Sequence, residues 1–163
     1  MKRVMRVAVP WLAGAVLALS AVAAGAIDVQ VSGAPWLKTL GAAQLEAGAG
    51  SDFASPVAEG ESLTVLSISG TGGAAWNVQV ALVGNPLEWP PGATLELRRV
   101  GGVSEAGIID GLAYQTVTAE PQSFFSGTGN YDEVEILVRL SGFSVETGPG
   151  LYTIGIRFDV ESI

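Results

Sequence analysis

The chain has 163 residues, with 8 Lys and Arg against 16 Asp and Glu, and it lacks histidine and cysteine. Without these two residues, Ser-His-Asp and Cys-His catalysis and nearly all zinc, copper and non-haem iron sites are excluded. The net charge of −8 excludes nucleic acid as a partner, because binding to phosphate groups needs clustered basic residues.

Residues 1–26 have the layout of a secretory signal peptide. Three basic residues stand among the first six, an apolar run extends from Val7 to Ala24, and small residues end the segment. We expect cleavage after Ala26, with Ala23 as the alternative. The other interpretation is an uncleaved membrane anchor, but the run is near the lower length limit for a span and contains Pro10.

Residues 27–163 are expected to form a single exported domain in the periplasm, at the cell surface or outside the cell. This length is sufficient for one core that holds together without disulfides. Five basic and 16 acidic residues give the segment a net charge of −11. No second long apolar run follows, so we expect the mature chain not to insert into a membrane.

Apolar and polar residues alternate through most of 27–163, which predicts strands with one buried and one exposed face. Clusters of Gly, Pro and Asn separate the runs and predict turns. The Ala- and Gly-rich segment 33–60 is expected to be a long loop or to add one short strand, with a single helical turn near 42–47. The predicted strands are 27–32, 62–69, 75–83, 94–100, 112–118, 122–125, 132–141 and 150–161. This pattern favours an all-β fold, and specifically an immunoglobulin-like antiparallel β-sandwich of seven to nine strands.

The first predicted strand suggests a mode of assembly. Ile27, Val29 and Val31 alternate with polar residues directly after the expected cleavage site, and Gly33-Ala34-Pro35 follows as a hinge. Such a strand can pair within its own domain, or it can add to the sheet of a neighbouring copy through main-chain hydrogen bonds. The arrangement resembles that of fimbrial subunits, which polymerise by donating a strand. The resemblance lies in the architecture, because no motif aligns and the disulfide frequent in those subunits is missing.

Residues 70–75 match G-x-G-x-x-A, which is the outline of a dinucleotide-binding turn. A dinucleotide site needs a helix after the glycines, whereas residues 76–83 alternate as a strand. We therefore interpret the glycines as a turn between strands and expect no cofactor. Ser-Gly-Thr-Gly recurs at 126–129 before another alternating run, which predicts the same turn role. Trp76 is expected in the core, and the alternative is a ligand-stacking role.

Three aromatic residues are candidates for a glycan-binding surface. Trp89 lies in the loop-like sequence N-P-L-E-W-P-P-G, and loops on rigid scaffolds often carry binding contacts. Together with Tyr114 and Tyr131 it would provide a platform for sugar rings. The alternative is that each ring covers part of the core, because the sequence does not place the three rings on one surface.

Asp132, Glu133 and Glu135 follow a glycine turn and offer oxygen ligands that suit calcium. Their spacing is not that of an EF-hand loop, so a solvated acidic face is the preferred interpretation and no metal site is expected. Paired carboxylates also serve glycoside hydrolases. Among 16 acidic residues such pairs arise without any function, so they do not indicate an enzyme.

The sequence therefore predicts a non-enzymatic, exported structural or interaction protein of the cell surface or periplasm. We expect it to self-associate by strand exchange into a filament or array, with Ile27, Val29 and Val31 on the exchanged strand. The alternative is a carbohydrate-binding module that uses Trp89 and the neighbouring aromatic residues. Neither function needs a cofactor.

The leader assignment can be tested on the full 163-residue sequence expressed in a bacterial host. We expect the exported protein to begin at Ile27, as determined by intact-mass spectrometry and N-terminal sequencing. An Ala26→Asp variant should not be cleaved after residue 26, because signal peptidase requires a small residue before the cut. A folded cytosolic protein that keeps Met1 would contradict the assignment.

Overall fold

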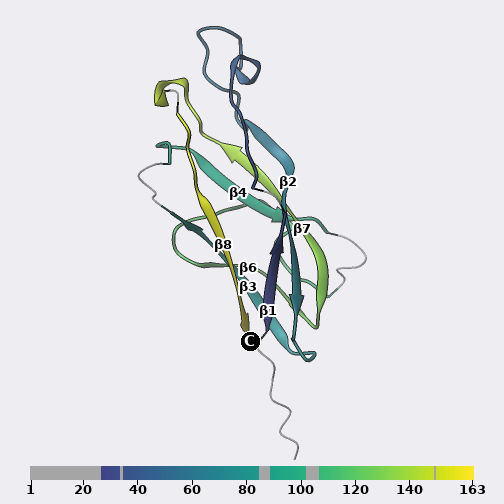
Figure 1. Ribbon diagram of the computed structural model, residues 1–163. Coiled ribbons are helices and arrows are strands. Elements are labelled where there is room, and N and C mark those ends of the chain that lie inside the picture. The colour runs from purple at the N-terminus through teal and green to yellow at the C-terminus, as the bar shows by residue number, and fades with distance from the viewer. Residues whose placement is uncertain (1–26, 34, 85–88, 102–106, 149) are drawn as a thin grey trace, which may run out of the picture.

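The computed structural model describes residues 27–33, 35–84, 89–101, 107–148 and 150–163. Within these ranges the chain forms two antiparallel sheets that pack face to face, and it has no α-helix (Figure 1). The expected all-β sandwich is therefore confirmed, and its eight described strands fall within the expected seven to nine.

The larger sheet is built on two long central strands. Its strand order is β1-β2-β7-β4-β5, and the smaller sheet has the order β6-β3-β8. The ladder between β2 and β7 contains three register shifts, whereas the ladder between β3 and β8 is regular along its whole length. The strands are β1 (Asp28–Ser32), β2 (Ala58–Ser69), β3 (Ala75–Val83), β4 (Thr94–Arg99), β5 (Gln115–Thr116), β6 (Gln122–Thr128), β7 (Tyr131–Ser141) and β8 (Gly155–Ser162).

All eight predicted strands are present, but four of them differ from the prediction by more than one residue at an end: β2, β5, β8 and also β6, which continues to Thr128 rather than 125. β2 begins four residues early, because Ala58, Glu59 and Glu61 pair with β7 through the main chain despite a polar sequence. β8 begins at Gly155 rather than at 150, because its partner β3 ends at Val83. Only two residues of the predicted strand 112–118 form β5, since only these pair with β4.

The segment between β1 and β2 is a long loop, which was one of the two structures expected for it. It contains the short 3₁₀ helix η1 (Ala42–Gln44), within the predicted helical turn, and one isolated bridge between Leu45 and Phe53. Figure 1 shows this loop extending beyond the sandwich at the end opposite the C-terminus. A second 3₁₀ helix, η4 (Val145–Thr147), lies at the same end. The Asp52 carboxylate joins the two segments by accepting a 2.8 Å hydrogen bond from the Val145 N–H.

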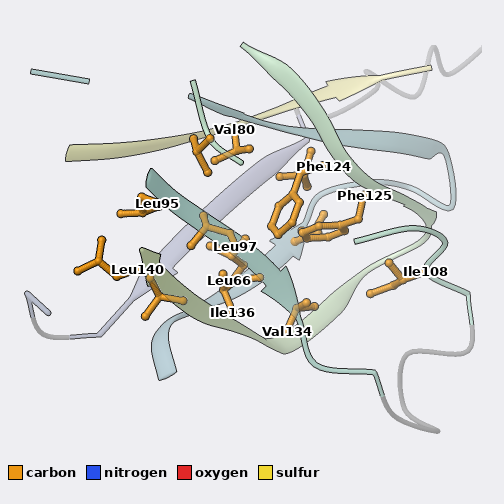
Figure 2. Close-up of a cluster of buried hydrophobic side chains, with 14 of the residues drawn as sticks. Leu66, Val80, Leu95, Leu97, Ile108, Phe124, Phe125, Val134, Ile136 and Leu140 are labelled. Atoms are coloured by element: carbon orange, nitrogen blue, oxygen red, sulfur yellow. The ribbon is translucent and has the colours of Figure 1, made fainter. Parts of the chain in front are cut away.

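The core lies between the inner faces of the two sheets, where apolar side chains from both sheets meet (Figure 2). Trp76 is fully buried, as expected, and its indole N–H donates a 2.7 Å hydrogen bond to the Gly129 carbonyl oxygen. The rings of Phe125 and Tyr131 meet it edge-on. Fully buried side chains around it are Leu66, Ile68, Val78, Leu97, Val134, Ile136 and Val138.

The glycine-rich motif is a turn, as interpreted from the sequence. Residues 70–74 connect β2 directly to β3, and the Ala74 N–H donates a 2.9 Å hydrogen bond to the Thr71 carbonyl oxygen. Thr71 is buried, and its hydroxyl donates a 2.8 Å hydrogen bond to the Asn130 side chain. The first motif and the turn between β6 and β7 therefore lie side by side.

The second Ser-Gly-Thr-Gly does not share this turn role. Its first three residues end β6, and only Gly129 lies in the turn. Gly127 is required there for packing, because a Cβ at this position would lie 2.6 Å from the Trp76 ring. The expectation of one shared role was therefore wrong. Gly127 of the second motif lies within β6 and packs against the Trp76 ring on the neighbouring strand instead of forming a turn.

Replacing Trp76 with Ala should lower the free energy of unfolding by about 3–5 kcal/mol, because a large buried ring is lost and a cavity remains. Chemical denaturation followed by circular dichroism measures the change. Trp89→Ala is the matched control, and its cost should be smaller because Trp89 is only partly buried. Equal losses for the two variants would contradict the central place given to Trp76.

Candidate functional site

The two sides of the sandwich differ in how they are closed. On one side, β5 and β6 face each other and side-chain hydrogen bonds join them. Gln115 donates to the Ser123 carbonyl oxygen at 2.9 Å, and Gln122 donates to the Thr116 carbonyl oxygen at 2.6 Å. On the other side, β1 ends one sheet and β8 ends the other, and they approach without pairing (Figure 1). We call β1 and β8 together the open side.

β1 is held mainly by its main chain. It pairs with β2 in the same chain, from Asp28 opposite Ser69 to Ser32 opposite Val65. The register places the predicted residues Val29 and Val31 on the inner face. Nevertheless Ile27 and Val29 are only partly buried, and Val31 is 52% exposed. The strand therefore adds little to the core, because its apolar side chains remain near the edge.

The hinge after β1 is short because the chain is fixed again directly beyond it. Gly33 has a φ of +137°, which favours glycine. Three residues later, the Trp36 indole N–H donates a 3.1 Å hydrogen bond to the Glu61 carboxylate, which also binds the Lys38 ammonium group. The hydrogen bond from Lys38 is the main reason that the pKa of Glu61 lies below its usual value, although burial opposes the shift. Gly33 thus separates β1 from Trp36, the next residue whose side chain is hydrogen-bonded to β2.

β8 carries alternating apolar and charged side chains. Ile156, Phe158 and Val160 point inward and are partly buried, while Arg157 and Asp159 point outward. The Arg157 Nε–H donates a 2.7 Å hydrogen bond to the Asp159 carboxylate, and both side chains are about half exposed, at 51% and 52%. Within the described ranges no strand pairs with the outer edge of β8.

The outer face of the smaller sheet is polar beside these charges. The Glu161 carboxylate accepts hydrogen bonds from the side-chain amides of Asn77, at 3.1 Å, and Gln79, at 2.7 Å. The Ser123 hydroxyl donates to Asn77 at 2.6 Å. Glu161 is therefore held by its own sheet, whereas Arg157 and Asp159, among the residues that the structure describes, form an ion pair with each other alone.

Trp89 and Tyr131 lie far apart. The Trp89 N–H donates a 3.0 Å hydrogen bond to the Ala93 carbonyl oxygen, and its ring meets Phe143 edge-on, just beyond the last residue of β7. Tyr131 is the first residue of β7 and contacts Trp76. β7 has 11 residues, and at about 3.3 Å per residue its ends are roughly 30 Å apart.

Tyr114 lies beside arginines on the outer face of the larger sheet, whereas Trp89 and Tyr131 pack against the core. The guanidinium carbons of Arg139 and Arg98 lie 4.4 Å and 5.2 Å from the centre of its ring. Arg139 binds the Glu96 carboxylate through two hydrogen bonds of 2.7 Å and 2.6 Å, which raise the pKa of the arginine. The Tyr114 ring is therefore engaged by the protein's own arginines. The structure does not bring Trp89, Tyr114 and Tyr131 together on one surface.

The acidic residues beside the second glycine turn do not converge. Asp132 and Glu133 are exposed. Glu133 and Glu135 border an open depression on the outer face of the larger sheet, with Ser32, Val65 and Ser67. In the part of the chain that the structure describes, no group of three or more acidic side chains is placed to hold a metal ion. The calcium interpretation therefore gains no geometric support.

Arg99 is a buried residue that the sequence reading did not single out. It follows Leu95 and Leu97 on the inner face of β4 and is 3% exposed. Its guanidinium donates hydrogen bonds to the carbonyl oxygens of Asp110, at 2.6 Å, and Ile108, at 3.0 Å. The sequence did contain a sign of this role, because Arg99 is a basic residue at an inward-facing position of an alternating strand. Its contacts indicate a structural role, namely holding residues 108–110 against the core.

Comparisons with known proteins provide no family for this chain, since no family model, curated protein or solved structure matches it. Over the described ranges, the structure contains no helix with the length and apolar character needed to cross a membrane. The open side is therefore the feature from which a function can be inferred.

Replacing Glu61 with Gln should loosen the segment that follows the hinge. We expect a lower free energy of unfolding at neutral pH, because the side-chain bonds from Trp36 and Lys38 weaken. Since the folded pKa of Glu61 is lowered, its contribution is complete above the unfolded pKa of about 4.3 and is lost as the pH falls through the folded value. The stability difference between wild type and variant should therefore shrink in acid.

Chemical denaturation of both proteins at several pH values measures these effects. Glu120→Gln is the matched control, because Glu120 is exposed and lies in the connection between β5 and β6. An equal loss of stability in both variants would show that Glu61 does not anchor the segment.

Proposed function

We propose that this protein is a non-enzymatic, exported structural or interaction protein of the cell surface or periplasm that self-assembles by exchanging β1. In the assembled form, β1 of one copy pairs with β2 of the next copy. The observation that carries the proposal is that β1 is an edge strand held by main-chain pairing with β2, with Val31 half exposed. Exchange of an identical strand keeps the same contacts, so it costs little free energy.

The hinge supports this exchange. Gly33 separates β1 from Trp36, which is hydrogen-bonded to Glu61 of β2. When β1 leaves its own sheet, the rest of the chain can stay in place because this anchor lies beyond the hinge. Conformational freedom is thus available where an exchanged strand needs it. The proposed export rests on the composition of residues 1–26, which lie outside the described residues.

We propose further that the sandwich is of the immunoglobulin type. In that fold one sheet has the order A-B-E-D and the other C-F-G. The observed order β1-β2-β7-β4 corresponds to A-B-E-D when β7 is taken as E, and the pair β3-β8 corresponds to C-F. β5 and β6 are then additions. In the described ranges, no strand occupies the position of G beside β8.

Cysteine cross-linking tests the exchange directly, because the chain has no cysteine of its own. Gln30 lies opposite Ser67 in the ladder between β1 and β2, at a separation that a disulfide can bridge. Gln30→Cys and Ser67→Cys chains with different tags should form a mixed disulfide when they assemble together. Non-reducing electrophoresis detects this product, and electron microscopy of the wild type should show extended assemblies.

The matched control combines Gln30→Cys with Glu120→Cys, because Glu120 is exposed and is not paired with β1. A yield of mixed disulfide no higher than in this control would refute the exchange. A chain that carries both Gln30→Cys and Ser67→Cys provides a second check. If it cross-links only within single molecules at every concentration, the exchange is also refuted.

A further inference from the structure

The open edge of β8 carries a defined set of main-chain groups. The Ile163 N–H donates a 3.2 Å hydrogen bond to the Ala75 carbonyl oxygen, and the register continues without a shift to Gly155 opposite Val83. In an antiparallel ladder, alternate residues exchange both hydrogen bonds with their partners. The odd-numbered residues of β8 therefore bond to β3, and the N–H and C=O groups of Ile156, Phe158 and Val160 point to the open edge.

We propose that β8 pairs with β8 of a second copy of this chain, antiparallel about a twofold axis at Phe158. Phe158 then lies opposite Phe158 of the second copy, Ile156 opposite Val160, and Arg157 opposite Asp159. The two small sheets become one continuous sheet with the order β6-β3-β8-β8-β3-β6. This inference goes beyond the proposed function, because it uses another strand and does not need β1 to move.

Main-chain geometry and side-chain faces agree in this register. The three residues that pair around the axis are those whose main-chain groups point to the open edge. Their side chains lie on the inner face and are only partly buried in the single chain, so pairing covers apolar surface. Antiparallel pairing with even-numbered residues opposite each other satisfies both conditions at once.

Charge then selects one register. With the axis at Phe158, Arg157 meets Asp159 of the second copy twice, and opposite charges across a ladder are favourable. Moving the axis to Arg157 places the two copies of this arginine opposite each other, and moving it to Asp159 does the same with that carboxylate. Like charges directly opposite are unfavourable. Glu161 does not change this choice, because it is held by Asn77 and Gln79.

Charge reversal is the decisive experiment. Arg157→Asp and Asp159→Arg should each weaken the dimer at least about tenfold, because each replaces two attractive pairs with two repulsive ones. A mixture of the two variants should form a heterodimer, since both charge pairs are then attractive. Sedimentation velocity and native mass spectrometry measure this. Both side chains are half exposed, and an exposed ion pair contributes little to stability, so both variants should fold.

Two further variants make the test specific. Glu120→Arg changes the net charge as Asp159→Arg does, at an exposed position away from β8, and should leave the dimer intact. Val160→Pro removes an N–H that faces the open edge but no bond to β3, and should abolish the dimer. If that variant does not fold, the charge variants decide alone.

Three outcomes would overturn the inference: a wild type that is monomeric at all concentrations, a mixture of the charge variants that does not associate, or a Glu120→Arg variant as weak as Asp159→Arg. The outcome of this experiment is independent of the outcome of the strand-exchange experiment. Exchange of β1 does not involve residues 157 and 159, so the heterodimer reports on β8 alone, and the cross-link between positions 30 and 67 reports on β1 alone.

Discussion

A β-sheet that does not close on itself leaves one row of main-chain groups without a strand partner along each edge. Where these unpaired main-chain groups lie determines which sides of the sandwich can bind a further strand. On the side of β5 and β6, glutamine side chains bond to main-chain carbonyl oxygens of the facing strand, and Ile109 forms a bridge to Ser126. On the side of β1 and β8 the described residues form no such bonds between the sheets. This asymmetry gives the domain one closed side and one open side.

The core can sustain an open side because its packing lies elsewhere. The fully buried residues concentrate on β2, β3, β4, β6 and β7, around Trp76. β1 and β8 contribute residues that are partly buried at most, apart from their main-chain pairing. A change at these two strands therefore leaves most of the buried apolar surface untouched. This separation between a fully buried centre and partly buried edges is compatible with the assembly proposed above.

Alternation along the sequence was sufficient to predict the strands, because each has one buried and one exposed face. It placed Val29 and Val31 correctly on one face, and Trp76 in the core. It could not predict where a ladder ends, since that depends on the partner: the run 112–118 keeps only Gln115 and Thr116 in β5. The separation of Trp89 from Tyr131, and the position of β8 at an edge, depend on strand order. Strand order is a property of the whole fold that no local segment contains.

The two interfaces proposed for the open side differ in geometry and in physical origin. Pairing of β8 about a twofold axis is closed and stops at a dimer, whereas one-way exchange of β1 continues from copy to copy. The twofold contact depends on exposed charge pairs, which salt screens within about 8 Å at physiological ionic strength. Exchange depends on main-chain hydrogen bonds, which salt affects little. Residues 27–163 carry 5 basic and 16 acidic residues, so copies repel one another at low salt. If both proposals hold, raising the ionic strength weakens the closed contact while it lowers the general repulsion, so the balance should shift from closed dimers toward open chains.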